Sequence, residues 1–394
     1  MKKELMSFYN GVNRKGIDAI KWDAGMMRVG KADLIPLWVA DSDYETCPEV
    51  KETLIKRTDN GTFGYTYSSP EYYKNIYNWF KSRHGISINE NHIVITPGVV
   101  NALYFVVKSF TKISDKVVIN TPVYNPFYEV VRNNGREILE NKLVRYELDD
   151  TFFTYRIDFD DLEEKLKEAK LYILCNPHNP VGRCFTYEEL DRIISLCKKY
   201  NVILVSDEIH CDLIMNGYKH CSVGNFFDEY ENLIICTAPS KTFNVAGLSN
   251  SNIIVNSEEL FNVLKKVYDD MEIELNVYGY EACKAAYSKG AYWVDLQNEY
   301  LGLQRDVVYD FVKKHGFKVS KLEATYLLWI DMSRLGLKQE ELFKGLIDNG
   351  VWVNKGTMYD SSCEGYIRIN VACGRRQLLD GLKCIENFIE SLNK

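Results

Sequence analysis

Lys241 is the residue whose type and position most clearly suggest chemistry. It lies in Ala-Pro-Ser-Lys-Thr-Phe-Asn-Val-Ala-Gly-Leu, residues 238–248, directly after the apolar run 233–236. The end of a buried strand disfavours the ammonium form of a lysine, so its amine is partly neutral and nucleophilic. A neutral amine of this kind can hold an aldehyde as a Schiff base.

An acidic residue at the end of another apolar run fits the same chemistry. Asp207 follows the run 202–206. A buried carboxylate needs a cationic or hydrogen-bonded partner, and a protonated pyridine nitrogen is both. Pyridoxal phosphate needs one group to hold its aldehyde and another to keep its ring nitrogen protonated. The pair therefore predicts that cofactor, although Asp207 could instead cap a helix or pair with a neighbouring side chain.

Three further segments follow strand-like runs. The glycine of 98–100 lets the backbone approach a phosphate at a helix N-terminus. Tyr124 has a flat face that suits a cofactor ring, and Asn179 lies in a proline-fixed loop that can aim its amide. Ligands bind beyond the carboxyl ends of parallel strands, which favours function. Each segment also has a plain structural explanation. Residues 98–100 could be an ordinary tight turn, Tyr124 a residue that only lines the wall of a pocket, and the loop of Asn179 a structural turn.

Arg368 lies among apolar residues in Glu-Gly-Tyr-Ile-Arg-Ile-Asn-Val, residues 364–371. An arginine in such a strand is costly unless it meets an anion, and its planar fork fits a carboxylate. An α-amino acid substrate would supply that anion. The alternative is an internal salt bridge.

Composition excludes several classes of function. The 394 residues are 46% hydrophobic and carry a net charge of −7, with no basic stretch, so we expect no nucleic-acid partner. No apolar run is long enough to span a membrane, and the N-terminus lacks a signal-peptide core. The 11 cysteines and six histidines are dispersed, which predicts reduced thiols, a cytoplasmic location and no metal site.

The order of apolar runs predicts an α/β fold. Short runs alternate with amphipathic helical patterns from about residue 90 to 256, which indicates a mostly parallel sheet covered on both faces. The C-terminal third predicts a smaller α+β unit. We therefore expect a large domain of residues 46–286, and a small domain of residues 1–45 and 287–394 that packs closely against it.

Together these motifs resemble those of fold-type I pyridoxal phosphate enzymes, which have the aspartate-aminotransferase-like fold. The branch they resemble most is the MalY/PatB group of carbon–sulfur β-lyases, which includes cystalysin-like enzymes and cystathionine β-lyases. The resemblance covers essentially the whole chain, in family order. It rests on segments 13–23, 36–43, 176–183, 207–210, 240–248 and 366–370.

The resemblance implies roles for particular residues. Lys241 would hold the cofactor aldehyde and transfer protons, and Arg368, helped by backbone near Val39 and Ala40, would bind the substrate α-carboxylate. Tyr65 would reach the phosphate of a neighbouring subunit, so a homodimer is expected. The other implied cofactor contacts are Asp207 to the pyridine nitrogen, Asn179 to the ring oxygen, Tyr124 stacked on the ring, and Val99, Val100 and Ser240 to the phosphate.

Two positions depart from relatives. Aspartate aminotransferases hold the phosphate with an arginine eight residues after the lysine, where this chain has Ser249. Asn125 stands where some relatives have an aromatic or acidic residue, and it could alter the substrate pocket.

The resemblance implies a β-lyase that acts on cystathionine, cysteine or related S-substituted cysteines and releases a thiol, pyruvate and ammonia. The same residues would serve an aminotransferase, which remains the alternative. Some members of the branch bind a transcription factor, so a regulator-binding protein is a minor alternative. The plainest alternative is an α/β protein whose lysine merely ends a strand.

Overall fold

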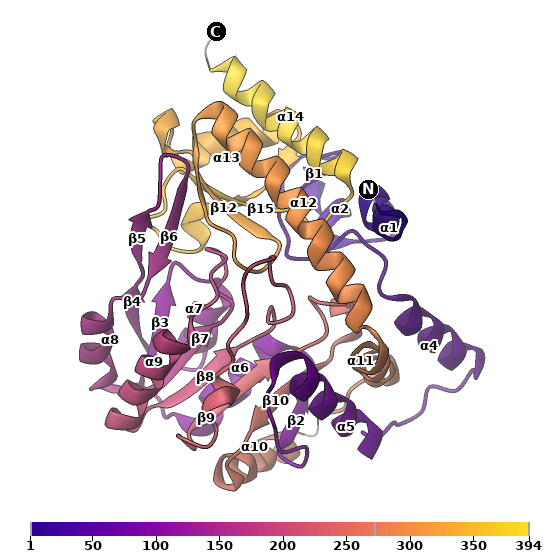
Figure 1. The fold of residues 1–394 in the computed structure, drawn as a ribbon, viewed down its shortest axis with the longest axis vertical. Helices are drawn as coiled ribbons and strands as arrows, with labels where there is room; N and C mark the ends of the chain where they lie inside the picture. The colour runs from indigo at the N-terminus through magenta and orange to yellow at the C-terminus, as the bar shows by residue number, and fades with distance from the viewer. Residues whose placement is uncertain (1, 272, 393–394) are drawn as a thin grey trace.

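The computed structural model describes residues 2–271 and 273–392. A seven-stranded sheet forms the lower part of the molecule in Figure 1. All its neighbouring pairs are parallel except those of β10, which is antiparallel to both of its neighbours. The strands in spatial order are β2 (Ile93–Thr96), β10 (Ser251–Val255), β9 (Leu233–Thr237), β8 (Ile203–Asp207), β7 (Ala169–Cys175), β3 (Lys116–Thr121) and β4 (Glu137–Lys142).

Alternate residues of these strands face two different apolar layers. In β7, Leu171 and Ile173 belong to the cluster on one face, and Tyr172 and Leu174 to the cluster on the other. The first face is covered by α6 (Val99–Phe110), α7 (Pro126–Asn133) and α10 (Glu258–Asp270), the second by α8 (Phe159–Leu166) and α9 (Tyr187–Tyr200). Burial on both faces explains the continuous apolar runs.

A six-stranded sheet lies above the first in Figure 1, against α12, α13 and α14. Its spatial order is β14 (Asn354–Lys355), β15 (Tyr366–Asn370), β12 (Leu327–Asp331), β11 (Lys318–Ser320), β6 (Phe152–Arg156) and β5 (Val144–Glu147). The helices are α12 (Ala291–His315), α13 (Gln339–Asp348) and α14 (Arg375–Ser391). Strand β1 (Ile35–Pro36) pairs in parallel with β13 (Val351–Trp352). This pairing joins the N-terminal segment of the chain to its C-terminal part.

The remaining helices connect these layers. They are α1 (Met6–Asn10), α2 (Ile20–Asp23), α3 (Gly25–Val29), α4 (Pro48–Asp59), α5 (Pro70–Trp79) with its π-helical continuation Phe80–His84, and α11 (Val277–Lys289). Short 3-10 segments occur at Lys3–Leu5, Val223–Phe226, Ala246–Leu248, Ser333–Leu335 and Gly356–Met358. None of the helices in the described part of the chain is long and apolar enough to cross a membrane.

The structure confirms the predicted α/β fold class. The division into residues 46–286 against 1–45 and 287–394 stays a prediction. Its boundary is crossed by the hairpin β5–β6, because these strands lie within 46–286 in sequence and pair in the sheet of the C-terminal strands.

The packing of α11 on the loop after Lys241 gives a test of the fold. A Cβ on Gly279 would lie 2.7 Å from the Leu248 carbonyl oxygen, which is backbone and has little room to move. We expect Gly279→Ala to lower the free energy of unfolding in urea by about 1–3 kcal/mol. Gly302→Ala in α12 is the matched control, because a Cβ there meets nothing within 4 Å. That control should raise stability by about 0.5–1 kcal/mol; equal effects of the two changes would contradict the packing.

Candidate active site

A cavity of about 180 Å³ lies at the carboxyl ends of the large sheet's strands. Such edges are where open α/β sheets bind ligands. Of the residues proposed from sequence, those that line the cavity are Ala40, Val99, Val100, Tyr124, Asn179, Asp207, Ser240 and Lys241. Folding thus brings together segments that are spread over two hundred residues of sequence.

Lys241 extends from the loop after β9 into the cavity. Its Nζ donates a hydrogen bond to the Ala40 carbonyl oxygen at 2.7 Å. Burial lowers the pKa of the amine, an effect opposed by the charge of Asp41 and reinforced by Arg368. The lysine is therefore poised to be neutral more readily than an exposed one.

Asp207 is the last residue of β8 and is buried. Its Oδ1 accepts one hydrogen bond, from the Ile209 amide at 3.1 Å, and it makes no ion pair with any described residue. Burial raises the pKa of its carboxyl to about 7. An N–H cation in the cavity would supply the missing partner and favour the carboxylate form.

Arg368 on β15 is only 2% exposed and lies beside the cavity. Its Nη1 donates to Asn179 Oδ1 at 3.1 Å and its Nη2 to the Trp38 carbonyl oxygen at 2.6 Å, while its Nε has no partner. Within residues 2–271 and 273–392 it forms no ion pair. The structure thus rules out an internal salt bridge to a described carboxylate, and a buried guanidinium with neutral partners is suited to an incoming anion.

The chain matches the model of the family called aminotransferase class I and II over residues 32–382. The chain belongs to this family. It is 38% identical to cystathionine beta-lyase PatB of Bacillus subtilis (strain 168), over 97% of this chain and 99% of PatB. These comparisons confirm the resemblance to the MalY/PatB branch.

Two solved structures resemble this family member closely. Cystalysin from Treponema denticola, which contains a pyridoxal 5′-phosphate cofactor, has a TM-score of 0.92 and 34% identity over 98% of this chain and 99% of its own. The PLP-bound C–S lyase from Staphylococcus hominis has a TM-score of 0.89 and 32% identity over 97% of both chains.

Two polar groups beside the cavity of this aminotransferase-family chain were not proposed as site residues from sequence. The His210 Nδ1 and the Tyr326 hydroxyl are buried and find no hydrogen-bond partner in the described part of the chain. Their rings meet edge to face with centroids 5.9 Å apart. Burial, with the charges of Lys241 and Arg368, lowers the pKa of His210 to about 3, so its ring is neutral. The one sequence signal for His210 is its place three residues after Asp207, and Tyr326 belongs to none of the motifs described above.

The N-terminus of α6 forms the end of the cavity that suits an anion. Its first residues, Val99 and Val100, line the cavity, and a Cβ placed on Gly98 would meet nothing within 4 Å. Among the described residues no arginine lines the cavity, and Ser249 occupies the position discussed above. Free amides, the helix dipole and the Ser240 hydroxyl are therefore groups available to an anion there.

Two predicted residues lie apart from the cavity wall. Tyr65 is 94% exposed and lines a separate surface hollow with residues 273–278. The Val39 carbonyl oxygen accepts a hydrogen bond from the Asn370 side chain at 2.6 Å, so it supports the loop beside the site. The predicted roles of these residues and of those that line the cavity stay predictions.

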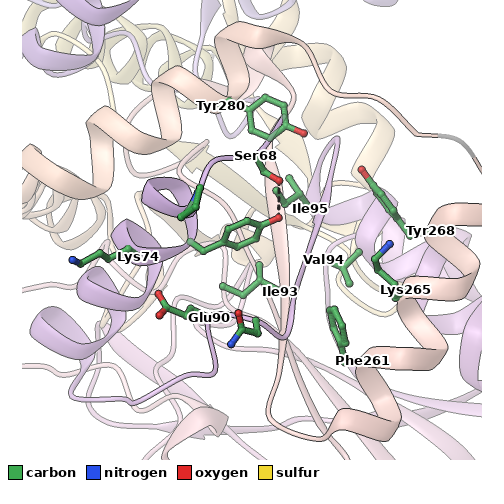
Figure 2. A pocket seen from close by; sticks show the side chains of 13 residues that line it. Ser68, Lys74, Glu90, Ile93, Val94, Ile95, Phe261, Lys265, Tyr268 and Tyr280 are labelled. Atoms are coloured by element: carbon green, nitrogen blue, oxygen red, sulfur yellow. Dashed lines mark hydrogen bonds between the residues drawn. The ribbon is translucent and has the colours of Figure 1, made fainter. Parts of the chain in front are cut away.

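A larger hollow, of about 640 Å³, lies beside edge strand β2 (Figure 2). None of the residues proposed from sequence lines it. The Ser68 and Tyr73 hydroxyls in it bond to each other at 2.7 Å, and Lys265 pairs with Asp269. These polar groups are already satisfied, so the hollow offers less for chemistry than the smaller cavity.

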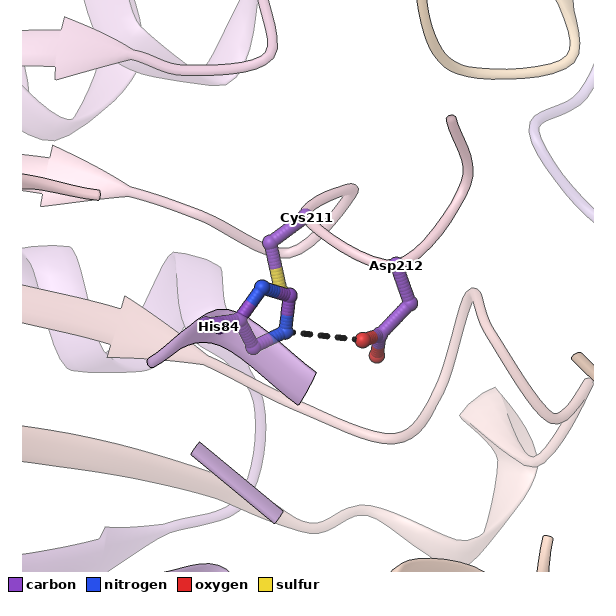
Figure 3. Close-up of side chains that lie close together, drawn as sticks. All are labelled: His84, Cys211 and Asp212. Carbon is purple, nitrogen blue, oxygen red and sulfur yellow. Dashed lines mark hydrogen bonds and ion pairs between the residues drawn. The ribbon is translucent and has the colours of Figure 1, made fainter. Parts of the chain in front are cut away.

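One described group of His, Cys and Asp side chains is compact enough for a metal ion: His84, Cys211 and Asp212 (Figure 3). The Asp212 carboxylate already accepts hydrogen bonds from His84 Nε2 at 2.9 Å, Trp79 Nε1 at 3.1 Å and the Thr242 hydroxyl at 3.0 Å. Nearby donors saturate it, so the group is better suited to structure than to a metal. Its bond to Thr242 anchors the residue next to Lys241.

This network predicts a difference between two carboxylates that share Arg83. Arg83 Nε lies 3.3 Å from Asp212 Oδ1. Asp212→Ala would leave the three buried donors described above without their acceptor, so we expect the free energy of unfolding to fall by about 3 kcal/mol or more. Asp295 pairs with Arg83 Nη2 at 2.9 Å but is 70% exposed. Asp295→Ala should cost less than about 1 kcal/mol. Comparable losses in urea unfolding would show that Asp212 is not the anchor.

Proposed function

We propose that this chain is a pyridoxal 5′-phosphate-dependent carbon–sulfur β-lyase. It acts on small amino acids, cystathionine, cysteine or related S-substituted cysteines, and releases a thiol, pyruvate and ammonia. The observation that carries the proposal is a buried arginine that no described carboxylate pairs with, beside a cavity lined by Lys241 and Asp207. The names of relatives such as PatB and cystalysin support it.

The cavity fits the cofactor on its own observations. Asp207 has one protein donor and a pKa raised by burial, which suits a partner at a pyridine nitrogen. The open space before α6 suits a phosphate. The residues that would hold the group are Lys241 at its aldehyde, Asn179 at its ring oxygen, Tyr124 on its ring, and Val99, Val100 and Ser240 at its phosphate. When bound, the cofactor withdraws electrons from the substrate Cα and acidifies its hydrogen.

The side chains of the protein then have distinct tasks. Arg368 binds the substrate α-carboxylate through its guanidinium, which Asn179 and the Trp38 carbonyl orient. Lys241 Nζ takes the proton from Cα, a task for which burial suits it by lowering the pKa of its amine. The sulfur substituent leaves Cβ as a thiolate that takes up a proton, and water replaces nitrogen in the product, which gives pyruvate and ammonia.

The proposed enzyme is a homodimer in the cytoplasm. Tyr65 is exposed next to the exposed rings of Phe63 and Tyr67, and it lies outside the cavity of its own chain. An exposed aromatic segment is suited to a second copy, whose phosphate Tyr65 would contact. All 11 cysteines are free in the structure, which supports a reducing compartment.

The choice between lyase and aminotransferase predicts a difference in co-substrate. The wild-type enzyme loaded with pyridoxal 5′-phosphate should release pyruvate steadily from L-cystathionine with no keto acid present, because elimination regenerates the cofactor. The measurement is coupled pyruvate detection over many turnovers. Lys241→Ala should lower the rate on the order of 10³-fold or more. Turnover that requires an added keto acid would make the chain an aminotransferase.

The dimer proposal predicts complementation between two impaired variants. Tyr65→Ala and Lys241→Ala homodimers each lack one group in both sites. A hybrid dimer would hold one site with both groups, so its pyruvate release should approach about half that of the wild-type dimer. Differently tagged chains, co-expressed and purified through both tags, give the hybrid. A hybrid no more active than its parents would show that Tyr65 does not act across subunits.

A further inference from the structure

The loop of residues 38–43, between β1 and α4, gives hydrogen-bond acceptors to both cations of the site. The Trp38 carbonyl oxygen accepts from Arg368, and the Ala40 carbonyl oxygen accepts from Lys241 Nζ at 2.7 Å. Asn370 Nδ2 holds the same loop by donating to the Asp41 carbonyl oxygen at 2.8 Å. The position of this loop therefore sets where both cations rest.

Three ion pairs from the N-terminal segment fix the loop. Lys21 Nζ lies 2.8 Å from Asp43 Oδ2, with both side chains fully buried, and also donates to the Asp41 carbonyl oxygen at 2.7 Å. Arg14 contacts both acids, Asp41 Oδ2 at 2.7 Å and Asp43 Oδ1 at 3.3 Å. The Asp41 carboxylate is thus held in one orientation beside the residue that accepts from Lys241.

Asp41 is also the charge with the largest effect on Lys241. It raises the pKa of the amine against the lowering caused by burial, and its effect exceeds that of Asp207. The other charged or titratable groups near Lys241 or Asp41 come from several elements. They are Asp207 at the end of β8, His210 after it, Arg368 on β15, Arg14 and Lys21 on the N-terminal segment, Asp43 in the loop itself and Tyr326 before β12.

We propose that the Asp41–Arg14 ion pair is a positioning device for proton transfer at Lys241. Arg14 holds the Asp41 carboxylate near Nζ, where it stabilises the ammonium that forms when Nζ takes the substrate Cα proton. The Ala40 carbonyl fixes the direction of the amine. The electron pair of the Cα–H bond stays on the substrate and the proton moves to Nζ, so the step balances without a further reactant. The proposal rests on the proposed lyase function.

The test compares Asp41→Asn with the wild type in the complete chain. Removing the negative charge destabilises the Lys241 ammonium, so its pKa falls and the amine stays neutral to lower pH. The rate at which cofactor-free protein captures added pyridoxal 5′-phosphate, followed by absorbance, should have its pH midpoint shifted down by roughly half to one pH unit. The acid limb of the kcat profile on L-cystathionine should shift the same way, with KM nearly unchanged.

Three further variants make the result specific. Asp41→Glu keeps the charge and should return the midpoint towards that of the wild type, and Asp41→Ser should repeat the downward shift if the asparagine variant folds poorly. Asp33→Asn is the matched control, because Asp33 forms an ion pair with Lys15 in the same N-terminal segment but is exposed. It should leave capture rate, pH midpoint and KM unchanged.

Two results would overturn the role of Asp41 in an active enzyme. The first is an unshifted pH midpoint in Asp41→Asn, whatever happens to KM or to the unfolding midpoint, since that pattern means the pair only supports the loop. The second is an equal shift in Asp33→Asn. Wild-type protein that releases no pyruvate without a keto acid would instead contradict the lyase function, so the two failures are distinguishable.

Discussion

A buried guanidinium with no counter-ion among the described residues is the constraint on which the site depends. Removing the charge of Arg368 from water costs free energy. The hydrogen bonds that offset this cost go to neutral groups, the Asn179 side-chain amide and the Trp38 backbone carbonyl. In the proposed function an incoming α-carboxylate would supply the missing anion, so substrate binding would complete the electrostatics of this buried position.

Two buried carboxylates, Asp212 and Asp43, position Lys241 indirectly, through the residues that they bind. On one side Asp212 accepts a hydrogen bond from Thr242, the residue after Lys241, and is itself fixed by its other donors, such as His84. On the other side the loop of residues 38–43 supplies the acceptor for Nζ and is itself fixed by Asp43. Rigid supports of this kind fix the geometry of a reactive amine while its protonation remains free to change.

The sequence was most informative where strands end. Lys241, Asp207 and Asn179 each follow an apolar run, and parallel pairing brings such ends together whatever the details of packing. Strand β4 escaped prediction because Glu137–Lys142 lies at the sheet edge and carries polar residues on a partly exposed surface. Asp41 and Tyr326 were given no role, because Asp41 acts on Lys241, which lies far from it in the chain, and Tyr326 packs on His210 of a different element, contacts that no local pattern reveals.

The hairpin β5–β6 gives the chain an unusual dependence on its own C-terminal end. Strand β6 of this hairpin pairs with β11, and β1 pairs with β13, so both must wait for strands made at least 160 residues later. During synthesis on a ribosome, the first half of the chain would therefore emerge with one edge of β6 and one edge of β1 still unpaired. Contacts of such sequence separation slow folding and expose sticky surface to other chains. These edges would stay unpaired until β11 and β13 have been synthesised.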